Sequence, residues 1–294
     1  MPDDVGSIAV LLVLVVAVLE LFWLLVVKRV SFRRDFFQPI KNIGLVIAAA
    51  TVITRIIPTV GWALLGATLA PFELPNEWYA WPIGLVVYEF WYWVQHFAAH
   101  KVRLLWCIHS PHHAPPTINL LVGTNHHFIE GLIYFPFFFG FMPALFGIPV
   151  EIIAVISLVD QCWGSMLHVS ADVVKRRYGV LEHFMQTPSY HRVHHAKNVR
   201  YMDTNYNSIT LLWDTIMGTR QTLLDDEPVD YGITREVNTE SLMAVQFGEF
   251  RALWRDVKAA PSVVNKVAYC LMPPGWSHDG NHQMVSTQQR ELGI

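Results

Sequence analysis

Residues 131 to 167 read GLIYFPFFFGFMPALFGIPVEIIAVISLVDQCWGSML, which is two apolar runs separated only by Ile148 and Pro149. At 1.5 Å per residue, each run approaches the length that a helix needs to cross the roughly 30 Å hydrocarbon core of a bilayer. So short a connection predicts an antiparallel helical hairpin that turns at one membrane face. Asp160 lies within the second run, where a polar side chain requires a structural or functional reason.

Three further stretches are apolar, namely 8–27, 43–70 and 81–98. Glu20 is the charged residue of the first stretch, and Arg55 and Pro58 interrupt the second, which we expect to be one tilted or kinked helix. Glu20 is a candidate partner for Arg55, because an unpaired charge inside a bilayer is costly. The sequence therefore predicts an all-α, multi-pass membrane bundle of about four to five spans.

The composition agrees with a membrane protein. Of 294 residues, 53% are hydrophobic and 15% are charged, with a mean hydropathy of +0.32. A soluble domain carries about a quarter charged residues, and a disordered chain carries many more. The net charge of −3 provides no basic field for nucleic acid. The three cysteines lack CxxC spacing, which argues against a disulfide framework or a thiolate metal site.

Basic residues in short loops indicate the orientation. The first loop, 28–41, is rich in Lys and Arg, and 175–177 reads Lys-Arg-Arg, whereas 71–80 carries Glu73 and Glu77 but no basic residue. Because such residues favour the cytoplasmic side, we expect residues 100–130 and the chain after His168 to be cytoplasmic, and 71–80 to face the opposite side. The chain ends without a retrieval signal, which favours a bacterial cytoplasmic membrane.

The same patterns divide the chain into three parts. Residues 1–42 are expected to form an N-terminal transmembrane helix with a basic cytoplasmic loop. Residues 43–219 would form the catalytic domain, and residues 220–294, which are polar and mixed, a cytoplasmic C-terminal cap.

Fourteen histidines are present, and most fall in clusters on the expected cytoplasmic side. One box has the form HxxxH and two have the form HxxHH; their histidines are His96, His100, His109, His112, His113, His191, His194 and His195. Helical residues four apart lie on one face, so both imidazoles of a pair can reach one metal ion, and the third histidine of each HxxHH box can serve a neighbouring ion. Imidazoles without cysteine suit iron, zinc, copper or nickel rather than calcium or magnesium.

A histidine-rich membrane metal transporter or metal-binding protein is an alternative reading of these boxes. A transporter normally places its ligands near the bilayer midplane between repeated halves. Here the boxes gather at one face and no inverted repeat is visible, so the sequence favours an enzyme.

The order of the three histidine boxes, and the sequence around the third box, resemble those of the fatty acid hydroxylase and sterol desaturase superfamily of membrane di-iron enzymes. The run 187–195 reads TPSYHRVHH, and DTNY at 203–206, WD at 213–214, GT at 218–219 and YGIT at 231–234 follow. The sequence of these runs is similar to that of a bacterial branch related to alkylglycerol monooxygenase. It favours this superfamily over the acyl-lipid desaturases. Asn207 stands where these relatives often have glycine, which predicts a different loop shape.

The resemblance implies two iron ions and two additional histidine ligands, His127 and His168, with His126 as an alternative to His127. It implies that dioxygen is used to hydroxylate, or to desaturate, a lipid or sterol-like substrate. It also implies an external electron donor, which is a ferredoxin or haem protein in most members and a reduced pterin in the alkylglycerol branch. The chain has no GxGxxG after a strand, no P-loop and no CxxCH, so no internal flavin, NAD or haem site is expected.

Four carboxylates lie near the boxes: Glu89, Glu130, Asp203 and Asp214. Carboxylates that accept the free imidazole N–H fix the tautomer and orientation of a metal-binding histidine. We expect this role for them, with turn or helix-cap chemistry as an equal alternative for Asp203 and Asp214.

Overall fold

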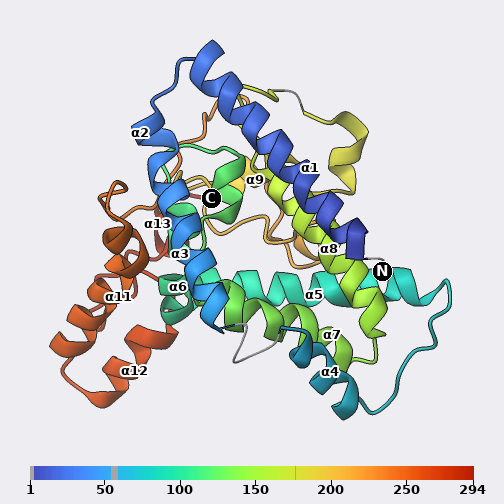
Figure 1. Cartoon of the computed structure of the whole chain (residues 1–294). Coiled ribbons are helices and arrows are strands. Elements are labelled where there is room, and N and C mark those ends of the chain that lie inside the picture. Colours follow the sequence, from blue (N-terminus) through green and yellow to red (C-terminus); the bar gives the residue numbers. More distant parts are fainter. Residues whose placement is uncertain (1–2, 54–58, 176) are drawn as a thin grey trace.

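The computed structural model describes residues 3–53, 59–175 and 177–294. Within these ranges every regular secondary-structure element is a helix (Figure 1). The β contacts there are limited to two isolated bridges, Met185–Thr210 and Ala196–Tyr231. The all-α class predicted from the sequence is therefore confirmed.

The N-terminal part consists of α1 (Asp3–Phe22), the π-helical turn η1 (Trp23–Val27), α2 (Phe32–Asp35), α3 (Phe37–Ile53) and α4 (Thr59–Leu69). Helix α1 lies along α8 (Val150–Leu167), as Figure 1 shows. Glu20 of α1 is buried, and its carboxylate accepts the backbone N–H groups of Leu120 at 2.6 Å and Ser170 at 2.7 Å. Glu20 thus joins α1 to two loops of the bundle; its expected partner Arg55, and Pro58, lie outside the described residues.

Helices α5 (Ala80–Lys101) and α6 (Arg103–His113) carry the first two histidine boxes. Pro82 occupies the first turn of α5, where its missing N–H has no intrahelical partner to lose. The extended Val102 ends α5 and lets the chain turn into α6, which packs back on α5. The short 3₁₀ turn η2 (Leu120–Thr124) follows.

The expected hairpin is formed by two helical runs. The first run comprises η3 (Glu130–Tyr134) and η4 (Pro136–Phe141), which are wide π-helical turns, followed by α7 (Met142–Leu145). The second run is α8, which contacts η4 and α7. Pro136 and Pro143 lack an N–H and explain the wide turns. Gly147 adopts φ +81° in the connection, and a Cβ there would lie 2.6 Å from the Phe72 ring, so the tight turn needs glycine.

Of the described helices, α8 alone is both long and apolar enough to cross a bilayer, while Leu11–Val27 and Pro136–Leu145 are shorter apolar helices. Large apolar side chains are exposed on the outer faces of α1, α3 and α4, including Leu12, Leu19, Ile47 and Leu69. Many exposed apolar side chains on neighbouring helices are typical of contact with lipid or a partner. The number of spans stays a prediction.

The remaining elements are η5 (Gly179–His183), α9 (Pro188–His194), α10 (Leu212–Ile216), α11 (Leu242–Ala259), α12 (Val263–Leu271) and α13 (Val285–Glu291). Helices α11 and α12 pack on each other and on α6, where they bury Cys107 with Leu253 and Tyr269. The sequence after residue 218 is polar on average and did not lead to a prediction of this helical pair, although Phe250, Leu253 and Val257 recur at helical intervals along α11.

Candidate metal centre

The first box lies in the last turns of α5. His96 and His100 are four residues apart, and their ring centroids are 5.3 Å apart on one face of the helix. Both side chains are buried, although they lie in the last turns of the helix. The spacing expected from the sequence therefore places both rings in one interior site.

The two HxxHH boxes face this site from α6 and α9. In α6, the rings of His109 and His113 lie on the side toward α5, with centroids 4.9 Å apart. Pro188 begins α9 at the first helical position, where proline is pre-organised, and directs its last turn into the same interior. His168 directly follows α8 and completes the set.

The structure divides nine of the ten expected ligands into two groups. In each group, one ring nitrogen per residue lies within 4.8 Å of all the others. The first group is His96, His100, His109, His113 and His194, and the second is His112, His168, His191 and His195. The groups adjoin, since the rings of His113 and His195 stack with centroids 4.4 Å apart.

Hydrogen bonds fix the tautomers of several rings in the first group. His96 Nδ1 donates to the Tyr206 carbonyl at 2.7 Å, His109 Nδ1 donates to Glu130 at 2.7 Å, and His194 Nδ1 donates to the Thr204 carbonyl at 2.8 Å. A neutral imidazole carries one N–H, so the Nε2 atoms of these rings are bare lone pairs. His96 Nε2 and His109 Nε2 nevertheless lie 3.0 Å apart, and His194 Nε2 is buried without a partner. Converging lone pairs repel unless a cation lies among them.

The second group shows the same pattern. His168 Nδ1 donates to the Gly164 carbonyl at 2.7 Å, which leaves its Nε2 bare. That nitrogen lies 2.8 Å from His191 Nε2 and 3.2 Å from His112 Nε2, while His191 Nε2 lies 3.0 Å from His195 Nε2. The donor set and its convergence fit a transition-metal ion in each group.

Burial favours the neutral form, which is the form that binds a metal, in most of these imidazoles. It lowers the pKa of His168 and His194 to about 3. It also lowers the pKa of His100, His113, His191 and His195 well below the ordinary value, and the neighbouring imidazoles add to this effect. Protons therefore compete little with a metal ion at neutral pH.

Two of the four expected carboxylates contact the imidazoles. Glu130 is fully buried and accepts from His109 Nδ1 at 2.7 Å and from His126 Nδ1 at 3.0 Å. Although burial opposes its charge, these two imidazoles lower the pKa of Glu130 to about 2. Asp203 lies 3.6 Å from His100 Nδ1, and its other oxygen pairs with Lys101 at 2.5 Å.

The other two carboxylates hold a loop rather than a ring. Glu89 accepts the backbone N–H groups of Ile209 and Thr210, and Asp214 accepts those of Tyr206 and Asn207. Asn207 completes the arrangement, because its side chain accepts from Asp214 N and donates to the Glu89 carbonyl. The loop thereby presents the Tyr206 carbonyl to His96, so Glu89 and Asp214 act on the centre through the backbone.

His127 lies outside both groups. Its ring contacts Phe128, Phe247 and Phe250, and its Nδ1 accepts the Ile129 N–H at 3.2 Å. His126 instead stacks on His112 with centroids 4.3 Å apart and, with His109 and Glu130, forms a further group of closely spaced donors. The geometry therefore places His126, and not His127, beside the centre, where its two ring nitrogens face Glu130 and the Gly123 carbonyl.

The sequence missed the carbonyl groups of Gly164, Thr204 and Tyr206, which fix three rings. Backbone acceptors have no residue-type signature. The unusual φ of +63° at Asp203 and +58° at Asn205 shows how tightly this loop is folded beneath α9.

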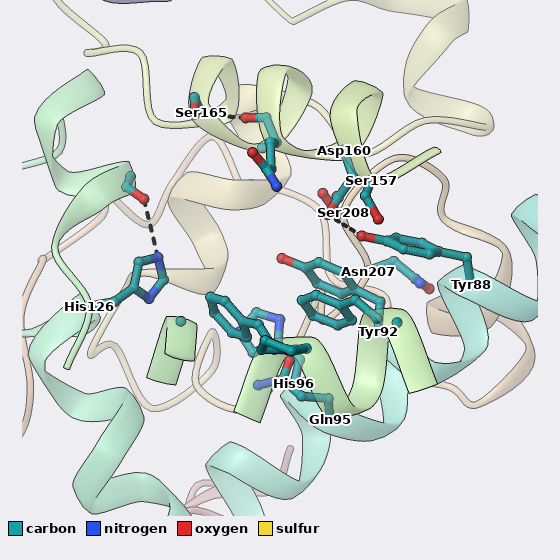
Figure 2. A pocket seen from close by; sticks show the side chains of 18 of the residues that line it. Tyr88, Tyr92, Gln95, His96, His126, Ser157, Asp160, Ser165, Asn207 and Ser208 are labelled. Atoms are coloured by element: carbon teal, nitrogen blue, oxygen red, sulfur yellow. Dashed lines mark hydrogen bonds between the residues drawn. The ribbon is translucent and has the colours of Figure 1, made fainter. Parts of the chain in front are cut away.

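A cavity of about 600 Å³ opens from the histidines into the helical bundle (Figure 2). His96, His109, His112, His168 and His191 line one end. Phe135, Phe139, Ile153 and Ala154 line the walls between the two runs of the hairpin. Such a mainly apolar cavity fits a hydrocarbon chain.

A second cavity of about 350 Å³ reaches the centre from the other side. His100, His113 and His194 line it, together with Trp106 and Lys101. The segments 232–234 and 273–275 also line it, so the YGIT run has a structural role here. His278, by contrast, lies in neither group, and its Nδ1 is 2.8 Å from Tyr269 OH.

Comparison with known proteins identifies the family. Residues 81–219, which include every box, match the family model described as fatty acid hydroxylase. The chain belongs to the fatty acid hydroxylase superfamily. Alkylglycerol monooxygenase of Homo sapiens is 33% identical over 209 residues, which are 70% of this chain and 44% of that protein. The corresponding enzyme of Xenopus tropicalis is 31% identical with the same coverage.

Ornithine lipid hydroxylase of Rhizobium tropici is 31% identical over 182 residues, which cover 58% of this chain and 54% of that protein. The chain thus spans about half the length of these relatives or less. No solved structure matches it significantly.

Proposed function

We propose that this protein is a membrane-bound di-iron oxygenase that hydroxylates a lipid. The observation that carries the proposal is the pair of imidazole groups at the end of an apolar cavity. The names of the relatives, an alkylglycerol monooxygenase and an ornithine lipid hydroxylase, support a lipid as the substrate.

Different residues would bind the metal ions and the lipid. The nine grouped histidines would hold two iron ions, which supply the ability to activate dioxygen for attack on an unactivated C–H bond. Phe135, Phe139 and Ile153 would hold the alkyl chain beside His96 and His112 and exclude water. The reaction balances as R–H, dioxygen, two electrons and two protons giving R–OH and water.

The electrons would come from an external donor. The second cavity supports a route for them, because it reaches His100 and His113 without crossing the lipid cavity. The Trp106 ring lines this cavity, and its centroid lies 5.1 Å from that of His100 and 5.6 Å from that of His113. A ferredoxin, a haem protein or a reduced pterin are the donor classes that we propose.

An isotope experiment tests the reaction. Membranes that contain the protein, a lipid substrate and a donor are supplied with heavy-isotope dioxygen, and we expect one heavy oxygen atom in a lipid alcohol by mass spectrometry. An unlabelled alkene would mean desaturation at the same centre. Metal-dependent ion flux with no oxidised lipid under any donor would support a transporter instead.

We further propose that the metal centre faces the cytoplasm and that residues 71–80 face the other side of a multi-pass bundle in a bacterial cytoplasmic membrane. Two contacts support this arrangement, in which the first loop lies on the same side as the C-terminal part and residues 71–80 lie on the same side as the hairpin turn. Arg33 of the first loop contacts Glu240 of the C-terminal part, whereas Leu74 N donates to Gly147 O in the tight turn of the hairpin.

Cysteine labelling tests this topology. In a variant with Cys162 and Cys270 changed to serine, we expect Asn76→Cys, but not Asp226→Cys, to react with an impermeant reagent applied to intact cells. Both positions are exposed, so a difference reflects the membrane. Labelling of residue 226 alone would reverse the orientation.

A further inference from the structure

Glu20 is a buried carboxylate that the proposed reaction does not use. It lies two residues before the end of α1, outside the residues that match the family model, and only 5% of its surface is exposed. A charged side chain in an apolar helix is costly unless its oxygens are paired. An apolar residue would serve the contact between α1 and α8 equally well, so the carboxylate requires a further role.

Both oxygens of this carboxylate accept backbone N–H groups. One accepts from Leu120 at 2.6 Å, and the other accepts from Ser170 at 2.7 Å. Leu120 is the first residue of η2, where an N–H group has no partner within its own helical turn. Ser170 lies in the loop that follows α8. Hydrogen bonds to an ionised acceptor are stronger than neutral ones, so Glu20 ties these two loops firmly to α1.

The two loops hold His168, an expected ligand of the second group, from two sides. Ser170 follows His168 by two residues, so its hydrogen bond to Glu20 limits the movement of the backbone that carries the ring. Gly123 of η2 packs on the ring itself, because a Cβ added there would lie 3.0 Å from His168 Nδ1. Apolar packing of α1 on both loops accompanies these contacts, through the buried cluster of Ala17, Leu120 and Val169.

The position of the His168 ring is critical for the second group. Its Nε2 lies 2.8 Å from His191 Nε2 and 3.2 Å from His112 Nε2, so a small movement of the ring changes how these nitrogens converge. The five histidines of the first group lie instead on α5, α6 and α9. Loss of the Glu20 hydrogen bonds should therefore affect the second group more than the first.

We propose that Glu20 is a positioning residue that holds His168 in place for metal binding. It acts through the two loops rather than by contact with a metal ion or a substrate. Helix α1, which lies beside α8 (Figure 1), thereby determines the affinity of one of the two metal sites. This inference rests on the metal centre of the proposed function, but it concerns metal affinity and can be tested without turnover.

Glu20→Gln tests the proposal because it keeps the shape of the side chain. The amide oxygen can accept one of the two N–H groups, while the NH₂ group opposes the other, so one loop must move. The full chain in nanodiscs is loaded with Co²⁺ without dioxygen and titrated with a chelator, and the metal content and visible spectrum are recorded. We expect one of two ions to bind about tenfold more weakly, the lower end of the range for outer partners of metal ligands.

Two backgrounds identify the ion that is affected. His191→Ala should lose the ion of the second group, and His194→Ala should lose that of the first. Glu20→Gln should weaken the remaining ion about tenfold in His194→Ala and leave the remaining ion unchanged in His191→Ala. A merely structural role would weaken the remaining ion equally in both backgrounds, because unfolding removes both sites.

Two further variants complete the experiment. Glu151→Gln, on the exposed first turn of α8, is the matched control and should retain both affinities. Gly123→Ala reaches the same ring from η2, since the added Cβ must displace His168, and it should weaken the same ion. This variant keeps the test valid if Glu20→Gln does not fold.

Unchanged affinity of the second-group ion in Glu20→Gln, or in Gly123→Ala where only that variant folds, would overturn the proposal. An equal loss from both groups would overturn it as well. Because Co²⁺ binding is measured without dioxygen or donor, selective weakening of one ion in a protein that hydroxylates no lipid would count against the proposed function alone. Hydroxylation by a wild type whose Glu20→Gln variant shows no selective weakening would count against this inference alone.

Discussion

Replacement of His191 or His194 by alanine is expected to remove bound metal and abolish hydroxylation. Each residue contributes to a different group, and His191 Nε2 lies within 3.0 Å of two other ring nitrogens of its group. Loss of an outer hydrogen-bond partner alone costs about 10- to 100-fold in metal affinity, so we expect loss of a ligand to exceed 100-fold. Metal analysis after dialysis against a chelator measures the effect.

The pair of variants also tests the division into two groups. Each substitution should deplete at least one of two ions per chain. His278→Ala is the matched control, because this histidine contacts Tyr269 and lies outside both groups, and it should leave metal content and activity unchanged. Full metal occupancy in His191→Ala would show that the second group does not hold an ion.

Glu130→Gln is expected to weaken metal binding by about 10- to 100-fold without unfolding the protein. The carboxylate accepts two imidazole N–H groups, from His109 and His126, whereas an amide presents one acceptor and one NH₂ donor. The NH₂ group would face one ring nitrogen that donates, so one of the two rings must turn or change its tautomer. Chelator competition and thermal unfolding of the same sample measure affinity and stability separately.

Glu77→Gln provides the control for this substitution, since Glu77 is exposed in the loop between α4 and α5. It should leave both metal affinity and melting temperature unchanged. If Glu130→Gln retained the wild-type metal affinity, the hydrogen bonds to His109 and His126 would have no role in holding the centre.

The helical class and the histidine boxes were predictable because they depend on local spacing. A four-residue interval places His96 beside His100, and His109 beside His113, on any helix. The long apolar runs likewise indicated the hairpin of η4, α7 and α8. The pair of helices α11 and α12 was not predicted, although Phe250, Leu253 and Val257 of α11 recur at helical intervals and pack toward Cys107 of α6.

Carboxylate roles could not be read from spacing alone. The seven-residue interval places Glu89 on the same face as His96, but two helical turns away from it. At that distance its carboxylate meets the backbone of Ile209 and Thr210 instead of an imidazole. Glu130 contacts two rings only because the chain between η2 and η3 folds back beneath α6.

The sequence by itself determined that histidines would converge at one end of a helical bundle, since their intervals and the neighbouring apolar runs are local properties. The same local geometry separates His112 from His113, because adjacent residues point about 100° apart on a helix. Only the tertiary structure decided that His112 joins His168, His191 and His195. It also placed His126 beside His112 and His127 against Phe247 and Phe250. Local spacing fixes which side chains share a face, whereas the packing of distant segments fixes what that face meets.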